Sequence, residues 1–281
     1  MQQPTLCPRK AADDMTTVIV GGDCSTTTTL ALAAAWPTSS ESDVVVVEAD
    51  PTGGSIAAWL DTPLSPSLST IVTQLHHSST TGSTAPMQWN SADSMIRTSH
   101  TGIRFIPAPF RTREARSAVS EAEHSLFPLL TSAPHTIALL DVGRLDALRP
   151  PAACRDAALT ILVHRLDACS APAATVRLER LAETVAALRD DRHTVALAVI
   201  GNTPFTLHEV VEFAAPGATT WPLALDPLAA AVFAGHTGVS ARRLARLPLP
   251  RSAARVAADL AATLTLGGGL EASGDLRVIE Q

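Results

Sequence analysis

Residues 16–29 read TTVIVGGDCSTTTT, and this stretch decides the fold. The β-branched run Thr16–Val20 predicts a strand, and the pair Gly21-Gly22 predicts a tight turn. The Ala and Leu content of the segment that follows favours a helix. Further along, Val44–Glu48 (VVVVE) predicts a second strand that stops at the turn Asp50–Gly54. A continuous apolar run of this kind is typical of a central parallel strand covered on both faces. Together the two strands and the helix between them predict a βαβ unit.

Strands and helices continue to alternate along the rest of the chain. The predicted strands are Ile103–Ile106, Thr136–Asp141, Thr160–His164 and Thr194–Ile200, and the segment Ala218–Leu223 leads into Asp226-Pro227. The predicted helices are Glu114–Leu130, Ala173–Leu188 and Arg251–Leu264. This alternation predicts an α/β fold: a doubly wound, mostly parallel sheet with helices on both faces. In such a fold the ligand site lies at the carboxyl ends of the strands.

Length and composition indicate one folded domain with a buried core. The chain has 281 residues, of which 46% are hydrophobic and 17% charged, and this excludes a disordered or fibrous protein. We assign residues 15–266 to the domain and expect flexible tails at 1–14 and 267–281. The Ser-, Thr- and Gly-rich segment His76–Ala92 is predicted to be a surface loop. No apolar run reaches about 18 residues, so we predict a cytoplasmic protein without a transmembrane segment.

Charge and cysteine content narrow the function classes. The net charge of −6 argues against a globally basic nucleic-acid binder. Lys10 is the single lysine among 21 basic residues, so a mechanism that needs a lysine within the domain is excluded. The cysteines show neither a CxxC pair nor a neighbouring His pair, which argues against a disulfide framework and a zinc site.

Three segments that follow predicted strands carry the chemical signal: GGDCSTTT from Gly21, EADPTGG from Glu48, and DVGR from Asp141. In this order they resemble the MinD/ParA-like P-loop ATPases of the SIMIBI class. That family has a phosphate loop KGGxGKTT, a second motif DxDPxG, and an Asp at the end of a third strand. The resemblance covers Thr16–Ala262, and EADPTGG is its most specific part. It implies a P-loop NTPase fold with a site for ATP and Mg²⁺.

The resemblance also implies roles for individual residues. The expected nucleotide-binding residues are Gly21, Gly22, Cys24, Ser25, Thr26, Thr27 and Asn202. The expected Mg²⁺-side residues are Thr26, Asp141 and Glu48. In such loops backbone N–H groups at a helix N-terminus point at phosphate oxygens, and a hydroxyl holds the metal. Asp50 falls on the catalytic carboxylate that orients the attacking water.

The loop departs from the family pattern at three positions. Val20 and Ser25 replace the two lysines, and Cys24 replaces a glycine. Losing one charge-assisted hydrogen bond costs about 1.5–3 kcal/mol, a roughly 10–100-fold loss of affinity. Hydrolysis suffers more, because a cation on the transferring phosphoryl group is worth on the order of 10³–10⁵ in rate. We therefore expect a slow ATPase at most, with Arg144 as a candidate substitute cation.

A divergent MinD-like subgroup, with G-x-x-G-x-TTT, EADPxGG and D-x-GR, shares the lysine-less loop. Cys24 departs from that pattern as well, and it introduces strain if its position needs a positive φ. Simpler interpretations also exist for the three segments. Thr26–Thr29 can cap a helix, Asp50-Pro51 can end a strand, and Asp141 can cap the helix after it.

Three functions remain open. The first is a nucleotide-binding regulatory or positioning protein with weak or no hydrolysis, which controls a protein partner or its own nucleotide-dependent homodimer. The second is a pseudo-ATPase scaffold that binds no nucleotide and acts in partner positioning or pilus and secretion assembly. The third is a DNA-segregation ATPase, which requires one basic face for nonspecific DNA binding. That face would comprise Arg242, Arg243, Arg246, Arg251 and Arg255.

Overall fold

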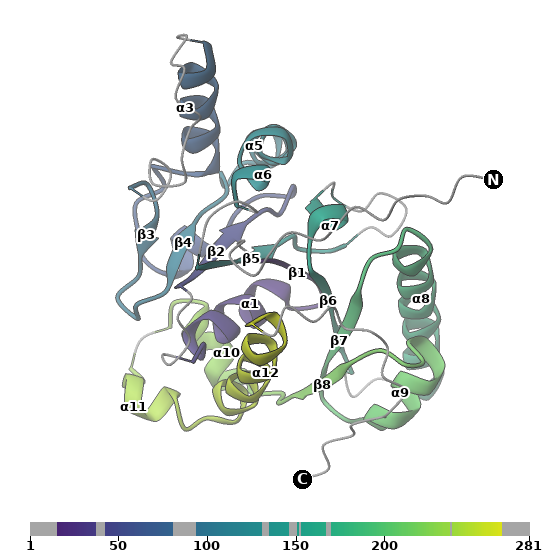
Figure 1. Ribbon diagram of the computed structural model, residues 1–281. Coiled ribbons are helices and arrows are strands. Elements are labelled where there is room, and N and C mark those ends of the chain that lie inside the picture. Colours follow the sequence, from purple (N-terminus) through teal and green to yellow (C-terminus); the bar gives the residue numbers. More distant parts are fainter. Residues whose placement is uncertain are drawn as a thin grey trace, which may run out of the picture.

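The computed structural model describes residues 16–37, 43–80, 94–130, 135–145, 151, 153–166, 170–236 and 238–265. These form one eight-stranded sheet in the order β3-β4-β2-β5-β1-β6-β7-β8 (Figure 1). The strands are β1 (Thr16–Gly22), β2 (Asp43–Glu48), β3 (Arg97–Thr98), β4 (Arg104–Ile106), β5 (Thr136–Asp141), β6 (Leu159–Arg165), β7 (Val195–Ile200) and β8 (Thr220–Leu223). All neighbouring strands are parallel except β3 and β4, which are antiparallel. The predicted α/β architecture is confirmed.

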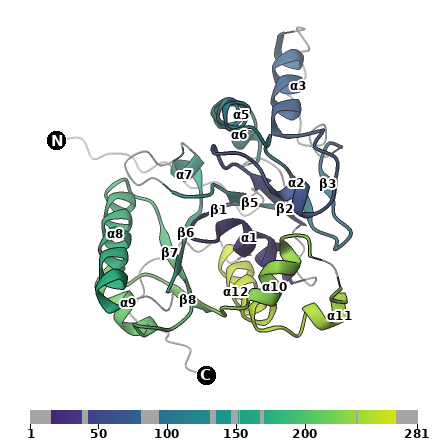
Figure 2. The same cartoon turned by 180° about the vertical axis from the view of Figure 1, so that it is seen from behind.

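Helices cover both faces of the sheet (Figures 1 and 2). They are α1 (Ser25–Ala34), α2 (Ile56–Trp59), α3 (Leu68–Thr80), α5 (Thr112–Ser125), α6 (Phe127–Leu130), α7 (Ala153–Asp156), α8 (Ala171–Asp190), α9 (Leu207–Ala214), α10 (Pro227–Phe233), α11 (Ala241–Leu244) and α12 (Pro248–Thr265). Helices α1, α10 and α12 pack on one face, and α3, α5, α6, α8 and α9 pack on the other. Within the described ranges no helix combines the length and apolar character needed to cross a membrane.

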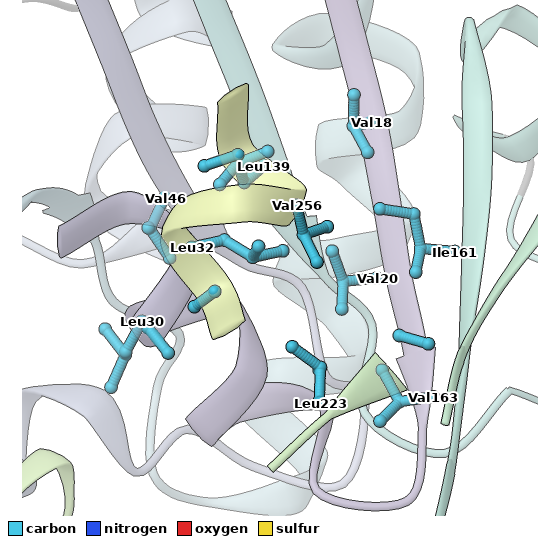
Figure 3. Close-up of a cluster of buried hydrophobic side chains, with 14 of the residues drawn as sticks. Val18, Val20, Leu30, Leu32, Val46, Leu139, Ile161, Val163, Leu223 and Val256 are labelled. Atoms are coloured by element: carbon cyan, nitrogen blue, oxygen red, sulfur yellow. The ribbon is translucent and has the colours of Figure 1, made fainter. Parts of the chain in front are cut away.

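The central strand β1 contributes side chains to both layers. Val18 and Val20 point into the core formed with α1 and α12, while Ile19 points into the core formed with α3 and α5. Figure 3 shows Leu32 of α1 and Val256 of α12 beside these valines. Because successive side chains of a strand alternate between faces, a run that is apolar throughout suits a strand buried on both sides.

The surface loop predicted over residues 76–92 was predicted to begin too early. Helix α3 continues through Thr80, and residues 81–93 lie outside the described part of the chain. A buried apolar stripe at helical spacing carries the helix past the polar residues: Leu68, Ile71, Val72 and Leu75. The predicted tails, residues 1–14 and 267–281, lie entirely outside the described residues. Helix α9 was not predicted, although Thr206 and Glu209 form a capping box that marks its start.

A buried carboxylate fixes the segment that follows β2. Glu48 is 1% exposed, and its Oε1 accepts hydrogen bonds from the backbone N–H groups of Ser55 (2.5 Å) and Ile56 (3.0 Å). Its Oε2 accepts from the N–H of Ala108 (2.9 Å), which follows β4. A Cβ at Gly54 would lie 2.5 Å from that oxygen, so glycine is required there. Burial raises the pKa of Glu48 to about 7, although the three N–H donors act in the opposite direction.

This pKa predicts how stability depends on pH. Because the folded-state pKa of about 7 exceeds the ordinary value of 4.5, the folded protein keeps a proton that the unfolded chain has already released. Stability should therefore fall as pH rises from about 4.5 to about 7, by about 3 kcal/mol. Glu48→Gln removes this titration. In urea unfolding without metal, the stability of the unmodified protein relative to this variant should be larger at pH 5 than at pH 8. Glu183→Gln, at an exposed position of α8, is the control, and a pH-independent difference for Glu48→Gln would contradict the assignment.

Candidate functional site

The three predicted motifs meet at one edge of the sheet. Strand β5 lies between β1 and β2, and the register pairs Asp141 with both Val20 and Glu48. Beyond the strands, the N–H of Gly22 donates to the carbonyl of Gly143 (2.8 Å), which links the segments after β1 and β5. The N–H of Ala49 donates to the carbonyl of Asp141 (2.7 Å), which links the segments after β2 and β5. Parallel pairing thus brings together motifs that are far apart in the sequence.

The loop after β1 opens onto the N-terminus of α1. Gly22 has φ 111°, and a Cβ there would collide with the carbonyl oxygen of Val163. Cys24 caps the helix in the left-handed region, with φ 56°, and gives no side-chain hydrogen bond to the helix. The first intrahelical bond runs from the N–H of Thr28 to the carbonyl of Cys24 (3.0 Å). The N–H groups of residues 25–27 precede that bond and form the positive end of the helix.

Cys24 is the non-glycine replacement expected to cause strain, and the structure shows the positive φ that causes it. A left-handed backbone costs an L-residue about 1–2 kcal/mol because Cβ approaches the following carbonyl. The Cys24 side chain is exposed, so it is not held in place by packing. Residue 24 therefore adopts a backbone conformation typical of glycine although it is a cysteine.

Asp141 lies at the centre of the site and is fully buried. Its Oδ1 accepts from the N–H of Gly143 (3.1 Å), and the hydroxyls of Thr26 and Ser25 lie beside the carboxyl. Its Oδ2 has no hydrogen-bond partner in the described part of the chain. Burial raises the pKa of Asp141, with a further contribution from the charge of Asp50, whereas the hydroxyls and the N–H lower it. A buried carboxylate oxygen without a partner costs free energy, and a bound cation would remove that cost.

Asp50 lies beside this carboxyl group at the end of β2. Its Oδ1 accepts from both the N–H and the hydroxyl of Thr52, each at 2.7 Å. The hydroxyl of Thr112 donates to the carbonyl of Thr52 (2.6 Å) and ties this turn to α5. The Asp50 carboxylate lies against Gly143, which has φ 64° and where a Cβ would collide with it. Asp50 is therefore held over the segment that contains Asp141.

The residues at this edge fit Mg²⁺ bound together with a phosphate. Mg²⁺ prefers oxygen ligands and keeps several waters, so it is bound by one or two protein groups plus substrate phosphates. The hydroxyl of Thr26 and the partnerless oxygen of Asp141 provide two such groups. Over the described residues no cluster of three His, Cys, Asp or Glu side chains could hold a metal. Both oxygens of Glu48 accept backbone N–H groups, and its predicted role as a metal ligand stays a prediction.

Two other predicted site residues make no contact with the loop among the contacts that the structure describes. Asn202 is exposed after β7, two strands away from β1, on the side of the sheet where the other motifs end. Arg144 is exposed directly after Gly143, and no contact described by the structure joins it to the loop. Their predicted roles, at a base and as a substitute cation, stay predictions.

Sequence reasoning missed an ion pair on the loop itself. The guanidinium Nη2 of Arg177, on α8, donates to the carboxylate Oδ2 of Asp23 at 2.8 Å. The two residues are 154 positions apart, so no local pattern could reveal the pair. Gly143 was also missed, although its Asp-x-Gly spacing from Asp141 is a signal that sequence reasoning could have used.

No protein-family model and no curated protein matches this chain. Solved structures do match. A ParA family ATPase from Chlorobium tepidum superposes with a TM-score of 0.63 at 13% identity, covering 89% of this chain and all of its own. The septum site-determining protein MinD from Pyrococcus horikoshii, complexed with Mg-ADP, gives 0.60 at 13% identity, covering 88% and 95%.

A chain of the MinC:MinD cell division protein complex from Aquifex aeolicus gives a TM-score of 0.56 at 12% identity. It covers 92% of this chain and 97% of its own. The alignments span nearly the whole of both chains, so the likeness concerns the complete domain. At the level of the fold, the resemblance indicated by the three sequence motifs is confirmed. This chain has the fold of the MinD and ParA P-loop ATPases.

Proposed function

We propose that this protein binds ATP with Mg²⁺ at the carboxyl ends of β1, β2 and β5. In this proposal the bound state controls a protein partner or the protein's own dimerisation, and hydrolysis is slow or absent. Solved structures of the same fold support the ligand class, since one is a complex with Mg-ADP. They also support a role in positioning through a partner, since they include a septum site-determining protein and a MinC:MinD complex.

The observation that carries the proposal is the Oδ2 oxygen of Asp141, which has no hydrogen-bond partner among the described residues. This acid is buried beside the Ser25 and Thr26 hydroxyls at the open N-terminus of α1. A chain that used the fold only as a scaffold could replace it with an apolar residue and gain stability. A cation at this oxygen, shared with a phosphate on the helix N-terminus, would offset the free-energy cost of the buried acid.

The residues present favour binding over turnover. In this proposal the backbone N–H groups of residues 21–27 hold the phosphates. The Thr26 hydroxyl and the Asp141 carboxylate hold the metal. The lysine that would act on the transferring phosphoryl group is replaced by Ser25, whose side chain is buried beside Asp141. When bound, Mg²⁺ would supply charge neutralisation at the phosphates. Asp50 is held by Thr52 in a position to orient a water molecule, and slow hydrolysis depends on it.

A scaffold without nucleotide is the second candidate. It is favoured by the strained backbone at Cys24 and by the replacement of both family lysines, at Val20 and Ser25. DNA binding is the third, and it is favoured by the exposure of the five arginines of the predicted basic face. These arginines belong to α11, the turn after it, and α12, on the layer that also contains α1. No contact that the structure describes joins these arginines to the Asp141 site, so the two hypotheses can be tested independently.

Nucleotide binding should raise the melting temperature. A ligand at 100 times its Kd stabilises the folded state by about 2.7 kcal/mol, or roughly 5–10 °C for a domain of this size. We expect this rise with Mg²⁺ and ATP in a thermal scan, compared with ADP, GTP and no nucleotide. Thr26→Ala should lose the Mg²⁺-dependent part, while Thr73→Ala, at an exposed position of α3, should not. No shift at millimolar nucleotide would make the scaffold the better hypothesis.

Restoring the lysine should strengthen binding. Ser25→Lys places an ammonium group where the loop now has a hydroxyl, and one charge-assisted hydrogen bond is worth roughly 10–100-fold in affinity. ATP titration calorimetry should show this gain for Ser25→Lys and none for Ser117→Lys, which adds the same charge at an exposed position of α5. Equal affinities for the two variants would mean that the loop does not receive phosphate in the P-loop manner.

Asp50 should matter for turnover and not for affinity. Asp50→Asn keeps an oxygen that can accept from Thr52 but removes the charge that orients water. We expect an ATP Kd within about twofold of the unmodified protein, and phosphate release reduced by on the order of 100-fold or to background. Asp190→Asn, at an exposed position of α8, is the control. A large loss of ATP affinity in Asp50→Asn would assign Asp50 a structural role instead.

A further inference from the structure

The phosphate loop carries an acidic side chain that is bound by another part of the fold. Asp23 follows Gly22, and its N–H donates to the carbonyl of Val163 in β6 (2.8 Å). Its carboxylate Oδ2 accepts from Arg177 Nη2 (2.8 Å) and from the N–H of Arg165 (3.2 Å). The ring Nδ1 of His164, a buried residue, is 3.8 Å from the same oxygen. One carboxylate oxygen is therefore surrounded by groups from β6 and α8.

The position of this acid creates an electrostatic problem for a phosphate site. Asp23 is adjacent to Cys24 and two residues from Ser25, where the N–H groups of α1 would meet an anion. A carboxylate this close repels phosphate, and the loop brings no basic side chain of its own, because Val20 and Ser25 stand where the family has lysines. Any positive charge beside the loop must come from another element.

Arg177 is in the right place to solve that problem. Its guanidinium contacts the Asp23 carboxylate directly, and both side chains are about one-third exposed, at 32% and 35%. An ion pair that open contributes little to stability. Its effect on an incoming anion is larger, because the pair converts the local charge at the loop from −1 to zero. The pair also tethers residue 23 to α8, next to the strained Cys24.

We propose that Arg177 is a positioning residue of the phosphate loop, which neutralises Asp23 and so makes the loop receptive to an anion. This rests on the proposed function for the identity of the anion, a nucleoside triphosphate. The electrostatic part concerns only residues of this chain and can be tested without nucleotide. Arg177 then performs, from α8, part of the task for which the sequence offers Arg144 as the candidate cation.

The first test combines charge changes on both partners. Arg177→Gln should weaken ATP binding about tenfold, equivalent to about 1.4 kcal/mol, because the Asp23 charge is left unbalanced. Asp23→Asn should bind at least as well as the unmodified protein, and the double variant Asp23→Asn/Arg177→Gln should regain affinity to within about twofold. Arg177→Lys should keep most of the affinity. Arg180→Gln, at an exposed position of the same helix, is the matched control.

Two results of that experiment would overturn the proposal. One is an Arg177→Gln affinity equal to that of Arg180→Gln. The other is a double variant that stays as weak as Arg177→Gln, since Arg177 would then act on the fold or on the nucleotide and not through Asp23. Melting temperatures of all variants separate a folding defect from a change in the loop.

The second test reads the charge at the loop through the exposed thiol of Cys24. Its rate of reaction with an anionic aryl disulfide, dithiobis-nitrobenzoate, is compared with the rate for a neutral one, dithiodipyridine, without nucleotide. Cys24→Ser protein gives the background from the other thiols. Arg177→Gln should lower the anionic-to-neutral rate ratio about two- to fivefold, and the double variant should restore it. An unchanged ratio would overturn the proposal.

The two tests separate the possible failures. If ATP does not bind the unmodified protein but the thiol ratio changes as expected, the proposed function fails and the role of Arg177 stands. If ATP binds and neither the affinity nor the ratio responds to Arg177→Gln, the role of Arg177 fails and the proposed function stands.

Discussion

The parallel pairing of β1 with β5 and β6 is the constraint on which the rest of the structure depends. Parallel strands that are buried on both faces end at the same edge, so whatever follows them is brought together. The register places Val20 beside Asp141 and Gly22 beside Val163, which fixes the phosphate loop between two neighbours. This placement also requires glycine at residue 22, where a Cβ would collide with the carbonyl oxygen of Val163.

Acidic side chains gather at the carboxyl ends of these strands, and different groups offset the negative charge of all but one of them. Backbone N–H groups surround Glu48, Thr52 holds Asp50, and Arg177 neutralises Asp23. Asp141 differs from these acids because one of its buried oxygens has no partner among the described residues. Because isolated buried charge is costly, the proposed function places its cation at this oxygen.

The strands were predictable because their signal is local. Thr136–Asp141 was predicted with the bounds that β5 has, since an apolar run between polar ends suffices to define a buried strand. Helix α3 was not predicted, and its end was assigned to a loop because its Ser, Thr and His residues outweighed the Leu68–Leu75 stripe, which packs in the core shared with α5. The motifs placed Asp50 and Asp141 correctly at strand ends. The pairing of Asp23 with Arg177 was not predictable, because only the fold brings α8 to the loop.

Placing positive charge on α8 instead of on the loop has a consequence for catalysis. A lysine of the loop can follow the phosphoryl group as charge develops on it, and so stabilises the transition state more than the ground state. Arg177 is instead paired with the Asp23 carboxylate, which also accepts from the backbone N–H of Arg165. It therefore neutralises the loop equally in the ground state and the transition state. Such uniform stabilisation raises affinity without raising the rate. Under our proposals, the loss of the lysines therefore separates binding from hydrolysis, which suits a protein whose bound state lasts long enough to be read by a partner.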